Sequence, residues 1–352
     1  MELETKGRPI FARAGPPTMD AWCYEGNAGG RPASDATGSW VRPNAALLAG
    51  LTQRVQDAVL PHFDAKPILY ADIPIHLNVG DLLINLAAET LFVDHGIEVQ
   101  DRVSLDNPQR LFRGRQGRDG TVVLHGGGNF GDLYPRHETF RQRVLESFPD
   151  RAVVLLPQTV HYQDRGRLRH DMRRWSGHRK LVFMVRDEPS LELVRPFLGE
   201  RAVLVPDLVH YLRCRPAWLT PTRPARSTAQ LMMARRDIEC PGPCRSRLNT
   251  HVFDWDDLCG PAEFGHFALA ARLIRFDNAV ALPFDPIWAW YPGRNRLIRK
   301  AVAHFGAASA VMTNRLHGML LALMMGVPVQ VRDNSYGKLT SYITSWSLAA
   351  DR

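Results

Sequence analysis

The chain is short of cysteine, of lysine and of long apolar runs, and each shortage excludes a class of protein. Five cysteines in 352 residues are few and odd in number, which is typical of reduced thiols rather than of a disulfide framework. No apolar run reaches the ~18 residues that a membrane span needs. The opening segment MELETKGRPIFARAG has no apolar core of the kind found in secretory signals. Together with a hydrophobic content of 45%, these absences predict a globular cytoplasmic protein.

Cationic residues outnumber acidic ones, and arginine supplies most of them. The formal net charge is +8, and only five of the 44 cationic residues are lysine. Biased codon usage explains the arginine without any function, whereas affinity for phosphorylated substrates, an acidic membrane surface or nucleic acid is the functional interpretation. The densest cluster consists of Arg165, Arg167, Arg169, Arg173, Arg174, Arg179 and Lys180.

A solvated helix face is the default interpretation of this cluster, and peripheral contact with an anionic membrane is the second. Nucleic acid comes third, and we expect no nucleic-acid partner, because no zinc-finger or RNP-type motif accompanies the charge.

Short apolar runs alternate with helical patterns from residue 67 onward. Strands are predicted over residues 67–71, 97–99, 122–124, 152–156, 181–185, 202–205, 230–234, 279–282, 307–312 and 327–331. Strands that alternate with helices indicate an α/β fold with parallel sheets. Ligands of such sheets bind beyond the carboxyl ends of the strands.

The composition divides the chain into four parts. Residues 1–60 are rich in Gly, Pro, Ala and Ser and are expected to form an irregular N-terminal arm, with a short helix over 45–59. Residues 61–213 form the first expected domain and residues 227–352 the second, and the proline-containing stretch 214–226 is the expected linker.

One strand-helix-strand unit, residues 307–331, contains the main candidate functional residues of the second half. The apolar face of its helix is formed by Leu316, Met319, Leu320, Leu323 and Met324. The first turn of this helix carries Arg315 and His317. Exposed N–H groups and the helix dipole favour an anion there. Arg315 adds a two-pronged grip on phosphate or carboxylate, and His317 adds a group that exchanges protons near neutral pH.

The motif Asn-x-Gly-Asp occurs twice in the first half, from Asn78 to Asp81 and from Asn129 to Asp132. Each copy follows a predicted strand and opens a helix. Helix capping explains the aspartates as well as a binding site does. The three consecutive glycines 126–128, however, exceed what a cap needs and allow a ligand to approach the backbone. The spacing matches neither the dinucleotide fingerprint nor the Walker A motif.

Single polar residues follow the other strands. Arg186 is a candidate anion ligand, although most arginines lie on the surface. His161 is a candidate for the cleft, and a structural histidine is an equally good interpretation. Cys240, Cys244, Cys259 and His251 raise the question of zinc, but their spacing departs from paired CxxC motifs and lacks a clean fourth ligand, so we expect no metal.

A series of motifs then resembles one known family. The motifs are HLNVGD, HGGGNFGDLYP, LPQTVHY, VRDEPS, VPDLVHY, ARRDIE, TNRLHGMLLALMMGVPV and DNSYGKL. In this order they resemble the polysaccharide pyruvyl transferase family, from about residue 67 to the C-terminus. The first 60 residues and residues 240–260 lie outside the resemblance.

The resemblance implies a fold similar to the GT-B glycosyltransferases, with two Rossmann-like domains whose parallel sheets face each other across a cleft. It implies a pyruvyl transferase that moves the carbon skeleton of phosphoenolpyruvate onto two hydroxyls of a sugar. The products are a cyclic pyruvate ketal and phosphate. The acceptor would be an exopolysaccharide or its lipid-linked precursor, and no cofactor is expected beyond phosphoenolpyruvate as co-substrate. The basic cluster would help to dock the protein at the inner membrane face.

The resemblance also assigns residues. The phosphoenolpyruvate side, in the second domain, is assigned Arg315, Leu316 and His317, together with Arg186 across the cleft, and we add the neighbouring Asn314. The acceptor side, in the first domain, rests instead on residues that follow predicted strands, where ligands of parallel sheets bind: Asn78, Asp81, Gly128, Asn129, Asp132, Gln158 and His161. Our hypothesis is that His317 is the general acid and that Asp132 or His161 assists the sugar hydroxyl. A GT-B nucleotide-sugar glycosyltransferase is the alternative, and a non-catalytic glycan-binding protein is the third interpretation.

Overall fold

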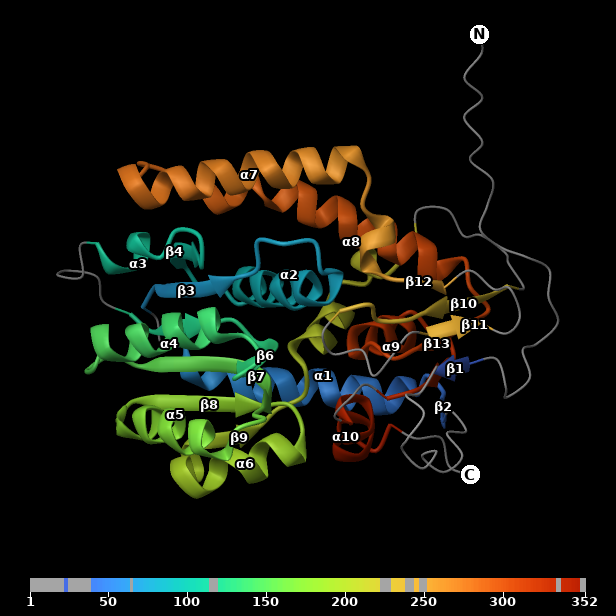
Figure 1. Cartoon of the computed structure of the whole chain (residues 1–352), viewed down its shortest axis with the longest axis horizontal. Coiled ribbons are helices and arrows are strands. Elements are labelled where there is room, and N and C mark those ends of the chain that lie inside the picture. The colour runs from blue at the N-terminus through green and yellow to red at the C-terminus, as the bar shows by residue number, and fades with distance from the viewer. Residues whose placement is uncertain are drawn as a thin grey trace, which may run out of the picture.

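The structure is a computed structural model, and it describes residues 22–24, 39–63, 66–113, 120–221, 229–237, 244–246, 252–333 and 337–348, with the backbone alone for 22–24 and 244–246. Two sheets lie toward opposite ends of the molecule, and helices pack between and around them (Figure 1). A separate strand pair joins β1 (Trp22–Tyr24) to β11 (Cys244–Ser246). This is an α/β fold, as the alternation predicts.

The larger sheet comes from the first half of the chain and is parallel in every pairing. Its strands are β3 (Ile68–Ile73), β4 (Val99–Ser104), β5 (Val122–Leu124), β6 (Gly127–Gly131), β7 (Val153–His161), β8 (Leu181–Val185) and β9 (Ala202–Leu204). The order is β4-β3-β5-β7-β8-β9, and β6 pairs with the carboxyl-terminal part of β7. All six residues of β3 are buried, as expected for a parallel sheet that is covered on both faces.

Helices connect these strands. They are α2 (Val79–Asp94), α3 (Gln109–Phe112), α4 (Pro135–Ser147), α5 (Arg165–Gly177) and α6 (Glu188–Leu198), and the 3-10 segments η2 (Gly199–Arg201), η3 (Leu208–Cys214) and η4 (Pro216–Trp218) lead out of the sheet. Several begin with the expected polar cap: Asn78 accepts from the N–H of Gly80 at 3.1 Å at the start of α2. Helices that follow strands in this half agree with the predicted α/β alternation.

The smaller sheet comes from the second half of the chain and is mixed. Its strands are β12 (Val252–Phe253), β10 (Gln230–Met233), β13 (Ala310–Thr313), β14 (Val329–Val331) and β2 (Ser39–Val41), in that order. The first four run parallel, and β2 pairs antiparallel with β14. Its helices are α7 (Pro261–Val280), α8 (Tyr291–Gly306), α9 (Leu316–Met324) and α10 (Lys338–Ser345), with the 3-10 segments η5 (Trp255–Leu258) and η6 (Pro286–Ala289).

Within the arm, the helix expected over residues 45–59 is confirmed as α1, whereas the strand β2 before it was not expected. After β2, the chain forms α1 (Ala45–Val59) and η1 (Leu60–His62), and Asn44 caps α1 by accepting from the N–H of Leu47 at 3.0 Å. A three-residue edge strand is too short to leave a periodic signal, and only its partner β14 reveals it. The second sheet is therefore completed by residues from the other end of the chain.

One expected strand is wrong and one strand was not expected. Of the strand expected over residues 279–282, the first two residues are the end of α7, where the carbonyls of Asp277, Asn278 and Ala279 accept from the guanidinium of Arg113. This side-chain cap comes from a distant segment, which a local apolar pattern does not reveal. The glycine-rich stretch after β5, for which no strand was expected, contains β6, where Gly131 at φ 131° allows close pairing with β7.

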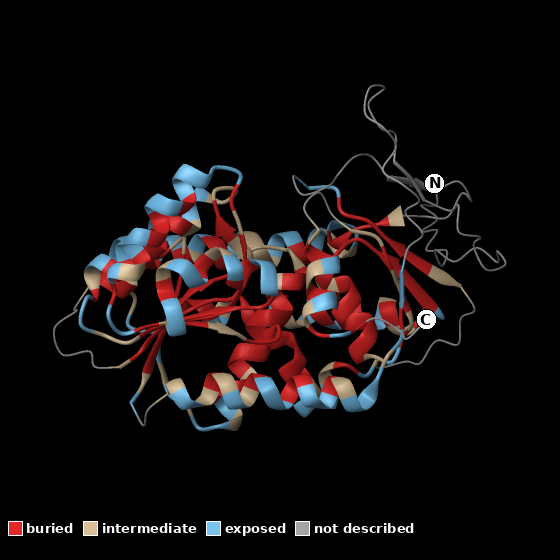
Figure 2. Cartoon of the chain, turned by 90° about the horizontal axis from the view of Figure 1, so that it is seen from below, coloured by how far each residue is buried: buried red, intermediate tan, exposed pale blue. Residues whose placement is uncertain are grey.

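The two sheets share a core. One apolar cluster includes Ile68 and Val123 of the first sheet together with Val311 and Val329 of the second. Helix α2 contacts α8, α9 and η3, so it lies between the sheets (Figure 1). Figure 2 shows buried positions, in red, continuing from the strands into the central helices. Packed helices therefore hold the two sheets together across the molecule.

Candidate active site

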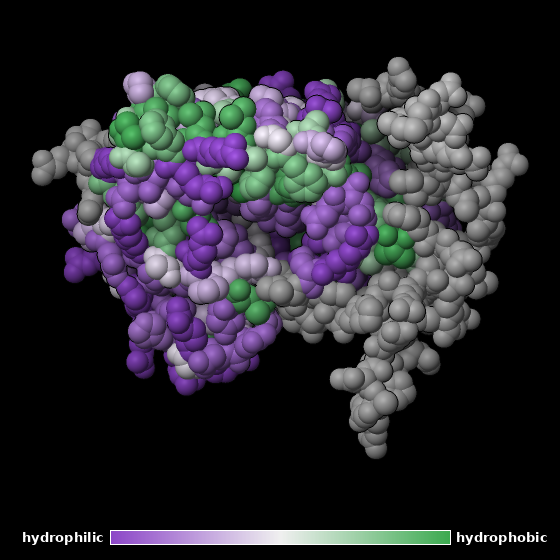
Figure 3. Space-filling model, turned by 45° about the horizontal axis from the view of Figure 1, so that its top comes forward, coloured by the Kyte–Doolittle hydropathy of each residue, from purple (hydrophilic) through white to green (hydrophobic). Residues whose placement is uncertain are grey.

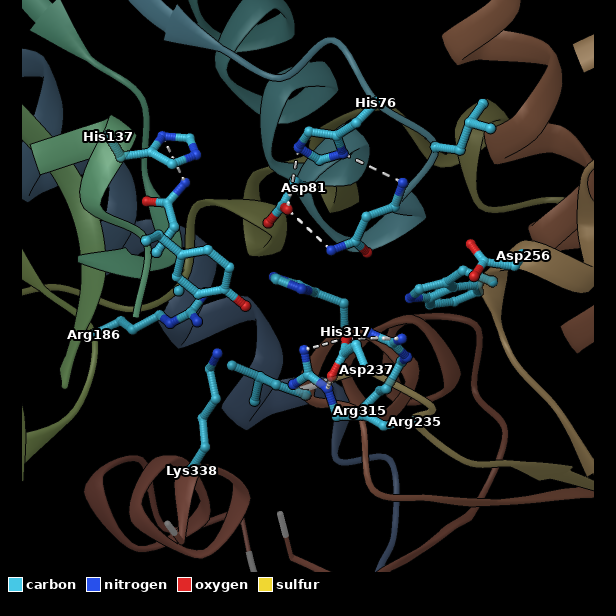
Figure 4. Close-up of a pocket in the computed structure, with 17 residues that line it drawn as sticks. His76, Asp81, His137, Arg186, Arg235, Asp237, Asp256, Arg315, His317 and Lys338 are labelled. Carbon is cyan, nitrogen blue, oxygen red and sulfur yellow. Dashed lines mark hydrogen bonds and ion pairs between the residues drawn. The ribbon is translucent and has the colours of Figure 1, made fainter. Parts of the chain in front are cut away.

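A cavity of about 530 Å³ lies where the strands of both sheets end (Figure 4). The first half of the chain lines it with His76, Leu77, Asn78, Asp81, Gly128, Asn129, Tyr134, His137 and Arg186. The second half lines it with Arg235, Asp237, Trp255, Asp256, Arg315, Leu316, His317 and Lys338. Most of these residues follow the carboxyl ends of parallel strands, where ligands of α/β proteins bind.

Eight of the predicted site residues line this cavity. They are Asn78, Asp81, Gly128, Asn129, Arg186, Arg315, Leu316 and His317. Two more lie directly behind the wall. Gln158 is buried, and its Nε2 donates to the carbonyl of His125 at 2.8 Å. Asn314 is buried, and its Oδ1 accepts from the N–H of Arg235 at 2.7 Å. These two side chains hold backbone in place instead of facing the cavity.

Asp132 and His161 are not part of the cavity wall. Both carboxylate oxygens of Asp132 accept from the N–H of Gln163, at 3.0 and 2.9 Å, and one accepts from Asp164 at 2.8 Å. The aspartate thus holds the turn before α5, because its short side chain reaches consecutive N–H groups. His161 ends β7, opposite Gly131. The structure does not bring either residue to the cavity, so their assistance to the sugar hydroxyl stays a prediction.

Arg186 follows β8 and is completely buried. Its Nη1 donates to Asp207 at 2.5 Å, and its Nε donates to Thr159 at 2.8 Å. Its Nη2 has no hydrogen-bond partner among the residues that the structure describes. A buried N–H group without an acceptor is unfavourable, and Arg186 belongs to the cavity wall, so an acceptor that reached Nη2 from the cavity would stabilise it.

Gly128 lies between Arg186 and Lys338. A Cβ atom added to Gly128 would lie 3.0 Å from Arg186 Nη2 and closer still to Lys338 Nζ. The two cationic groups therefore converge over a residue without a side chain, and Figure 4 shows them entering the cavity from different elements. Lys338 is the first residue of α10. We call Arg186, Gly128 and Lys338 the cationic corner of the cavity.

Arg315 lies in the cavity wall, but its guanidinium is bonded to carboxylates of the protein itself. Its Nε and Nη2 contact the two oxygens of the buried Asp254, the latter at 2.6 Å, and Nη2 is also 3.2 Å from Asp237. Arg235 contacts the same Asp237 through Nε at 2.8 Å and Nη2 at 3.0 Å. The two-pronged grip that the sequence predicts for an anionic ligand is thus made with Asp254.

His317 starts from the second sheet and reaches the wall of the first. It lies in the first turn of α9, and its Nε2 is 3.2 Å from Asp207 Oδ2, the oxygen that also accepts from Arg186. A Cβ atom on Gly80, at the start of α2, would lie 2.5 Å from His317 Nδ1. Glycine at this position therefore allows the imidazole to fit between the two halves.

Asp207 links the histidine and the arginine electrostatically. Its burial raises the pKa of the carboxyl, but the charges of His317 and Arg186 outweigh burial, so the pKa lies well below its ordinary value. The carboxylate also accepts from the N–H of Val209 at 2.9 Å. An ionised Asp207 orients the imidazole through Nε2.

The sequence did not single out several polar groups of the cavity, among them His137. Its Nδ1 is 2.7 Å from Asp72 Oδ1, and Arg141 Nη2 is 2.6 Å from Asp72 Oδ2. Burial raises the pKa of Asp72, but His137 and Arg141 outweigh it and lower the pKa to about 2. Since an ionised carboxylate only accepts, Nδ1 of His137 carries the hydrogen and its Nε2 is the basic nitrogen.

Some missed residues left a signal in the sequence. Lys338 is one of only five lysines and stands in the word DNSYGKL, directly after the last strand. His137 lies in the first turn of α4, and no local pattern separates it from a surface histidine. Of the residues that raised the question of zinc, Cys240 and His251 lie outside the described residues. In the described ranges, no cluster of three or more His, Cys, Asp and Glu is arranged to hold a metal.

Comparisons with known proteins agree with this geometry. The family model described as polysaccharide pyruvyl transferase matches residues 78–336. A Bacillus subtilis protein, EpsO, whose name describes it as a pyruvyl transferase, is 30% identical over 283 residues, which are 79% of this chain and 85% of that protein. Pyruvyl transferase 1 of Schizosaccharomyces pombe is 27% identical over 296 residues, or 80% of this chain and 70% of the yeast protein.

A crystal structure of a functionally uncharacterised Klebsiella pneumoniae protein has a similar fold. The TM-score is 0.56 at 18% identity, and the alignment covers 84% of this chain and 93% of the other. The family match includes most of the residues that form the cavity, from Asn78 through Arg186 to His317. The chain therefore belongs to the polysaccharide pyruvyl transferase family, a family of enzymes.

Proposed function

We propose that the chain transfers the pyruvyl group of phosphoenolpyruvate to two hydroxyls of one sugar, forming a cyclic ketal and releasing phosphate. The observation that carries this proposal is the meeting of Arg186, Lys338 and His317 in one cavity. Cationic groups there suit a small acid phosphate, and an imidazole beside them suits proton transfer. The reaction as proposed uses no cofactor.

The cationic corner is the proposed seat of an acidic group of phosphoenolpyruvate. Arg186 Nη2 needs an acceptor, and Lys338 Nζ approaches the same point over Gly128. The N-terminus of α9 adds backbone N–H groups of favourable polarity on the opposite side. Arg315 contributes positive potential to the wall, while its Nε and Nη2 stay on Asp254. Arg186 is thus the principal anion ligand of this proposal.

His317 is the proposed general acid. Protonation of the methylene carbon of phosphoenolpyruvate turns it into a methyl group and leaves an electron-poor central carbon. The first sugar hydroxyl attacks that carbon and loses its proton. The carbon–oxygen bond to phosphate then breaks, and the second hydroxyl attacks the same carbon and loses its proton in turn. Of the two protons released, one restores His317 and the other leaves with phosphate.

His137 is the proposed first acceptor of one hydroxyl proton, which it then passes to the departing phosphate. Asp72 holds its Nδ1 at 2.7 Å, and the residue lines the cavity on the side of the first sheet. An imidazole oriented by a buried carboxylate is a common form of general base. This assignment takes the role that the sequence had offered to Asp132 or His161, neither of which reaches the wall. Asn78, Asp81 and Asn129 would contact the sugar.

The larger arrangement follows from the same proposal. The first sheet would supply the acceptor side and the second the phosphoenolpyruvate side, in a GT-B-like architecture with the cavity between them. Because Arg186 and Lys338 share a corner, the two sides meet at the phosphoenolpyruvate itself. The acceptor would be a sugar of an exopolysaccharide or of its lipid-linked precursor, modified in the cytoplasm.

Phosphate release tests the proposal. The protein is incubated with phosphoenolpyruvate and a panel of glycosides and lipid-linked oligosaccharides, and inorganic phosphate is measured with and without each acceptor. We expect acceptor-dependent release and a thermal shift with phosphoenolpyruvate. A thermal shift with nucleotide sugars alone, with no phosphate released from phosphoenolpyruvate by any acceptor, would instead favour the nucleotide-sugar glycosyltransferase.

A further inference from the structure

Helix α7 and the segment after it present large apolar side chains to solvent. Six of them, Phe264, Leu269, Phe276, Val280, Phe284 and Trp288, are each between 50% and 69% exposed. Figure 3 shows the green side chains gathered over this helix on the face that it displays. We call these six residues the apolar ridge. Large apolar side chains gathered in this way on one exposed element are a feature of interaction sites.

Hydrogen bonds from two arginines fix the end of α7 and the segment after it on the side that faces the protein. Arg113 donates to the carbonyls of Asp277 and Asn278 at the end of α7, the former at 3.2 Å. Arg110 donates to Asp277 at 3.0 Å and to the carbonyl of Phe284 at 3.1 Å. The backbone carbonyls of this segment thus have hydrogen-bond donors on the side that faces the protein. The outward position of Val280 and Phe284 is therefore a property of the folded chain rather than of a frayed helix end.

The charges on the outward face of α7 have one sign. Arg272 and Arg275 are exposed on α7: Arg272 lies one helical turn before Phe276, and Arg275 lies three turns after Phe264 on the same side of the helix. Both acidic residues of α7 point inward: Glu263 pairs with Lys300 at 2.8 Å, and Asp277 is completely buried. Arg275 has one distant acidic neighbour, Asp106, at 3.9 Å. The outward face of α7 is thus apolar and basic.

We propose that the apolar ridge docks on an anionic lipid surface. A helix that combines Phe and Leu with arginine can lie in the interface of a bilayer, with its apolar side chains in the acyl boundary and its cations at the headgroups, and Trp288 of η6 adds a side chain that favours this interface. A second copy of this chain fits less well. A two-fold contact along α7 would bring Arg272 and Arg275 of both copies together, with no carboxylate on the outward face of this helix to pair with them.

The helix that carries the apolar ridge directly follows, in the sequence, a segment that lines the cavity. Trp255 and Asp256 of η5 line the cavity, and Gly260, two residues after η5, caps α7. A membrane contact through α7 would therefore hold one rim of the cavity near the bilayer. This contact differs from the one that the sequence suggested, because the basic cluster on α5 has no apolar ridge beside it among the exposed large hydrophobic residues. The inference does not depend on pyruvyl transfer.

Vesicle flotation tests the inference with the full chain. We expect the protein to float with vesicles of equal parts phosphatidylglycerol and phosphatidylcholine and not with phosphatidylcholine alone. The triple variant Phe264→Ser, Leu269→Ser, Phe276→Ser should bind at least about tenfold more weakly, because three apolar side chains leave the interface. Thermal unfolding shows whether the variant is folded, and none of the three residues is buried.

A matched pair of charge variants locates the contact. Arg272→Gln with Arg275→Gln removes two positive charges from α7, and Arg169→Gln with Arg173→Gln removes two from α5. We expect the first pair to lower vesicle affinity about tenfold and the second to change it by less than about threefold. The reverse order would overturn the inference in favour of the α5 cluster.

Tryptophan quenching supplies a measurement that needs no destabilising change. Brominated phosphatidylglycerol should quench emission in the wild type, and Trp288→Phe should remove much of that quenching. Trp40→Phe is the control, since Trp40 is 43% exposed on β2. Quenching lost with Trp40 instead of Trp288, absence of wild-type flotation, or a wild-type dimer in light scattering that the triple variant dissociates would each overturn the inference.

Discussion

The two walls of the cavity each contain a buried arginine, and the two guanidinium groups are used differently. Arg186, in the wall of the first sheet, is bonded to one carboxylate and one hydroxyl, and its Nη2 is left without a partner among the described residues. Arg315, in the wall of the second sheet, contacts two carboxylates, those of Asp254 and Asp237. Both residues were expected to hold phosphoenolpyruvate.

This difference suggests separate roles: Arg186 can bind a ligand, and Arg315 stabilises the folded wall. A guanidinium already matched by carboxylates contributes less to an anion than one with an unmatched nitrogen. We therefore propose that the wall of the first sheet is the stronger anion site, at the corner that Arg186 shares with Lys338. The wall of the second sheet supplies His317, which crosses to Asp207 of the first. In the proposed reaction both sheets would contribute, but through different kinds of group.

The largest expected effect is on turnover, at the residue that joins the walls. His317→Gln should lower turnover about a thousandfold, since it removes the general acid. Phosphate release measures the effect, and thermal unfolding should show an intact fold. His161→Gln is the control, because His161 does not line the cavity, and its turnover should stay within about twofold of wild type. Turnover of His317→Gln within about threefold of wild type would reject the general-acid role.

The next effect contrasts the two arginines directly. Arg315→Lys should lower the free energy of unfolding by about 3 kcal/mol, because the buried Asp254 loses a two-pronged partner. The KM for phosphoenolpyruvate should change by less than about threefold. Arg186→Lys should instead raise that KM between about tenfold and a hundredfold, because lysine cannot replace both bonds and Nη2.

Urea unfolding and steady-state kinetics on the two variants separate these outcomes. The comparison of the walls would be wrong if Arg315→Lys raised the KM more than Arg186→Lys did. It would also be wrong if both variants lost only stability, since neither guanidinium would then be the principal anion ligand.

The pH dependence of the free energy of unfolding distinguishes the residues behind the first wall from those behind the second. His125 lies behind the glycines of the first wall, with Nδ1 2.6 Å from the hydroxyl of Tyr70, and burial lowers its pKa to about 4. Between pH 6.5 and that value, the unfolded chain binds a proton that the folded chain does not. Stability therefore falls as the pH falls through this window, by about 2 kcal/mol between pH 7 and pH 5.

Urea unfolding at both pH values measures this loss. His125→Gln should remove the share of the loss that is due to His125, about half of the total, because the buried His210, whose pKa burial also lowers to about 4, contributes a similar share. Arg315→Lys should leave the pH dependence unchanged because that variant keeps both histidines. An unchanged slope in His125→Gln would show that His125 does not supply the expected loss.

The smallest effect concerns the space in the cationic corner. Gly128→Ala should raise the KM for phosphoenolpyruvate about fivefold, because the new methyl group would crowd Arg186 Nη2. Gly50→Ala is the control: a Cβ there meets nothing within 4 Å, so it should leave KM unchanged and slightly stabilise α1. Equal KM values for the two variants would place the anion away from this corner.

The structure brings most of the predicted site residues, but not all of them, to one cavity. Strand β8 and helix α9 lie where their apolar patterns predicted, and Arg186 and His317 therefore came to the same cavity. Asp132 was a candidate because it repeats the Asn-x-Gly-Asp motif, yet its carboxylate holds backbone N–H groups. A motif that caps a turn and a motif that binds a sugar look alike until the neighbours are known.

Other residues carried no local signal. Asp72 lies within β3 at a positive φ of 66°, and only His137 and Arg141, from another helix, reveal its role. Asp254 belongs to the stretch 240–260, which lies outside the family motifs, and its partner Arg315 is 61 residues away along the chain. Such pairings depend on distances of a few ångströms between distant segments, which no periodicity encodes.

The sequence by itself determined the alternation of strands and helices, and with it the edge of the sheets at which a ligand binds. Apolar runs have to be buried, and parallel strands all end on one side, so that result needs no coordinates. Only the tertiary structure decided which charged groups neutralise one another and which one faces the cavity. Electrostatic pairing acts over a few ångströms, and the two sheets reach that separation only after the shared core has packed.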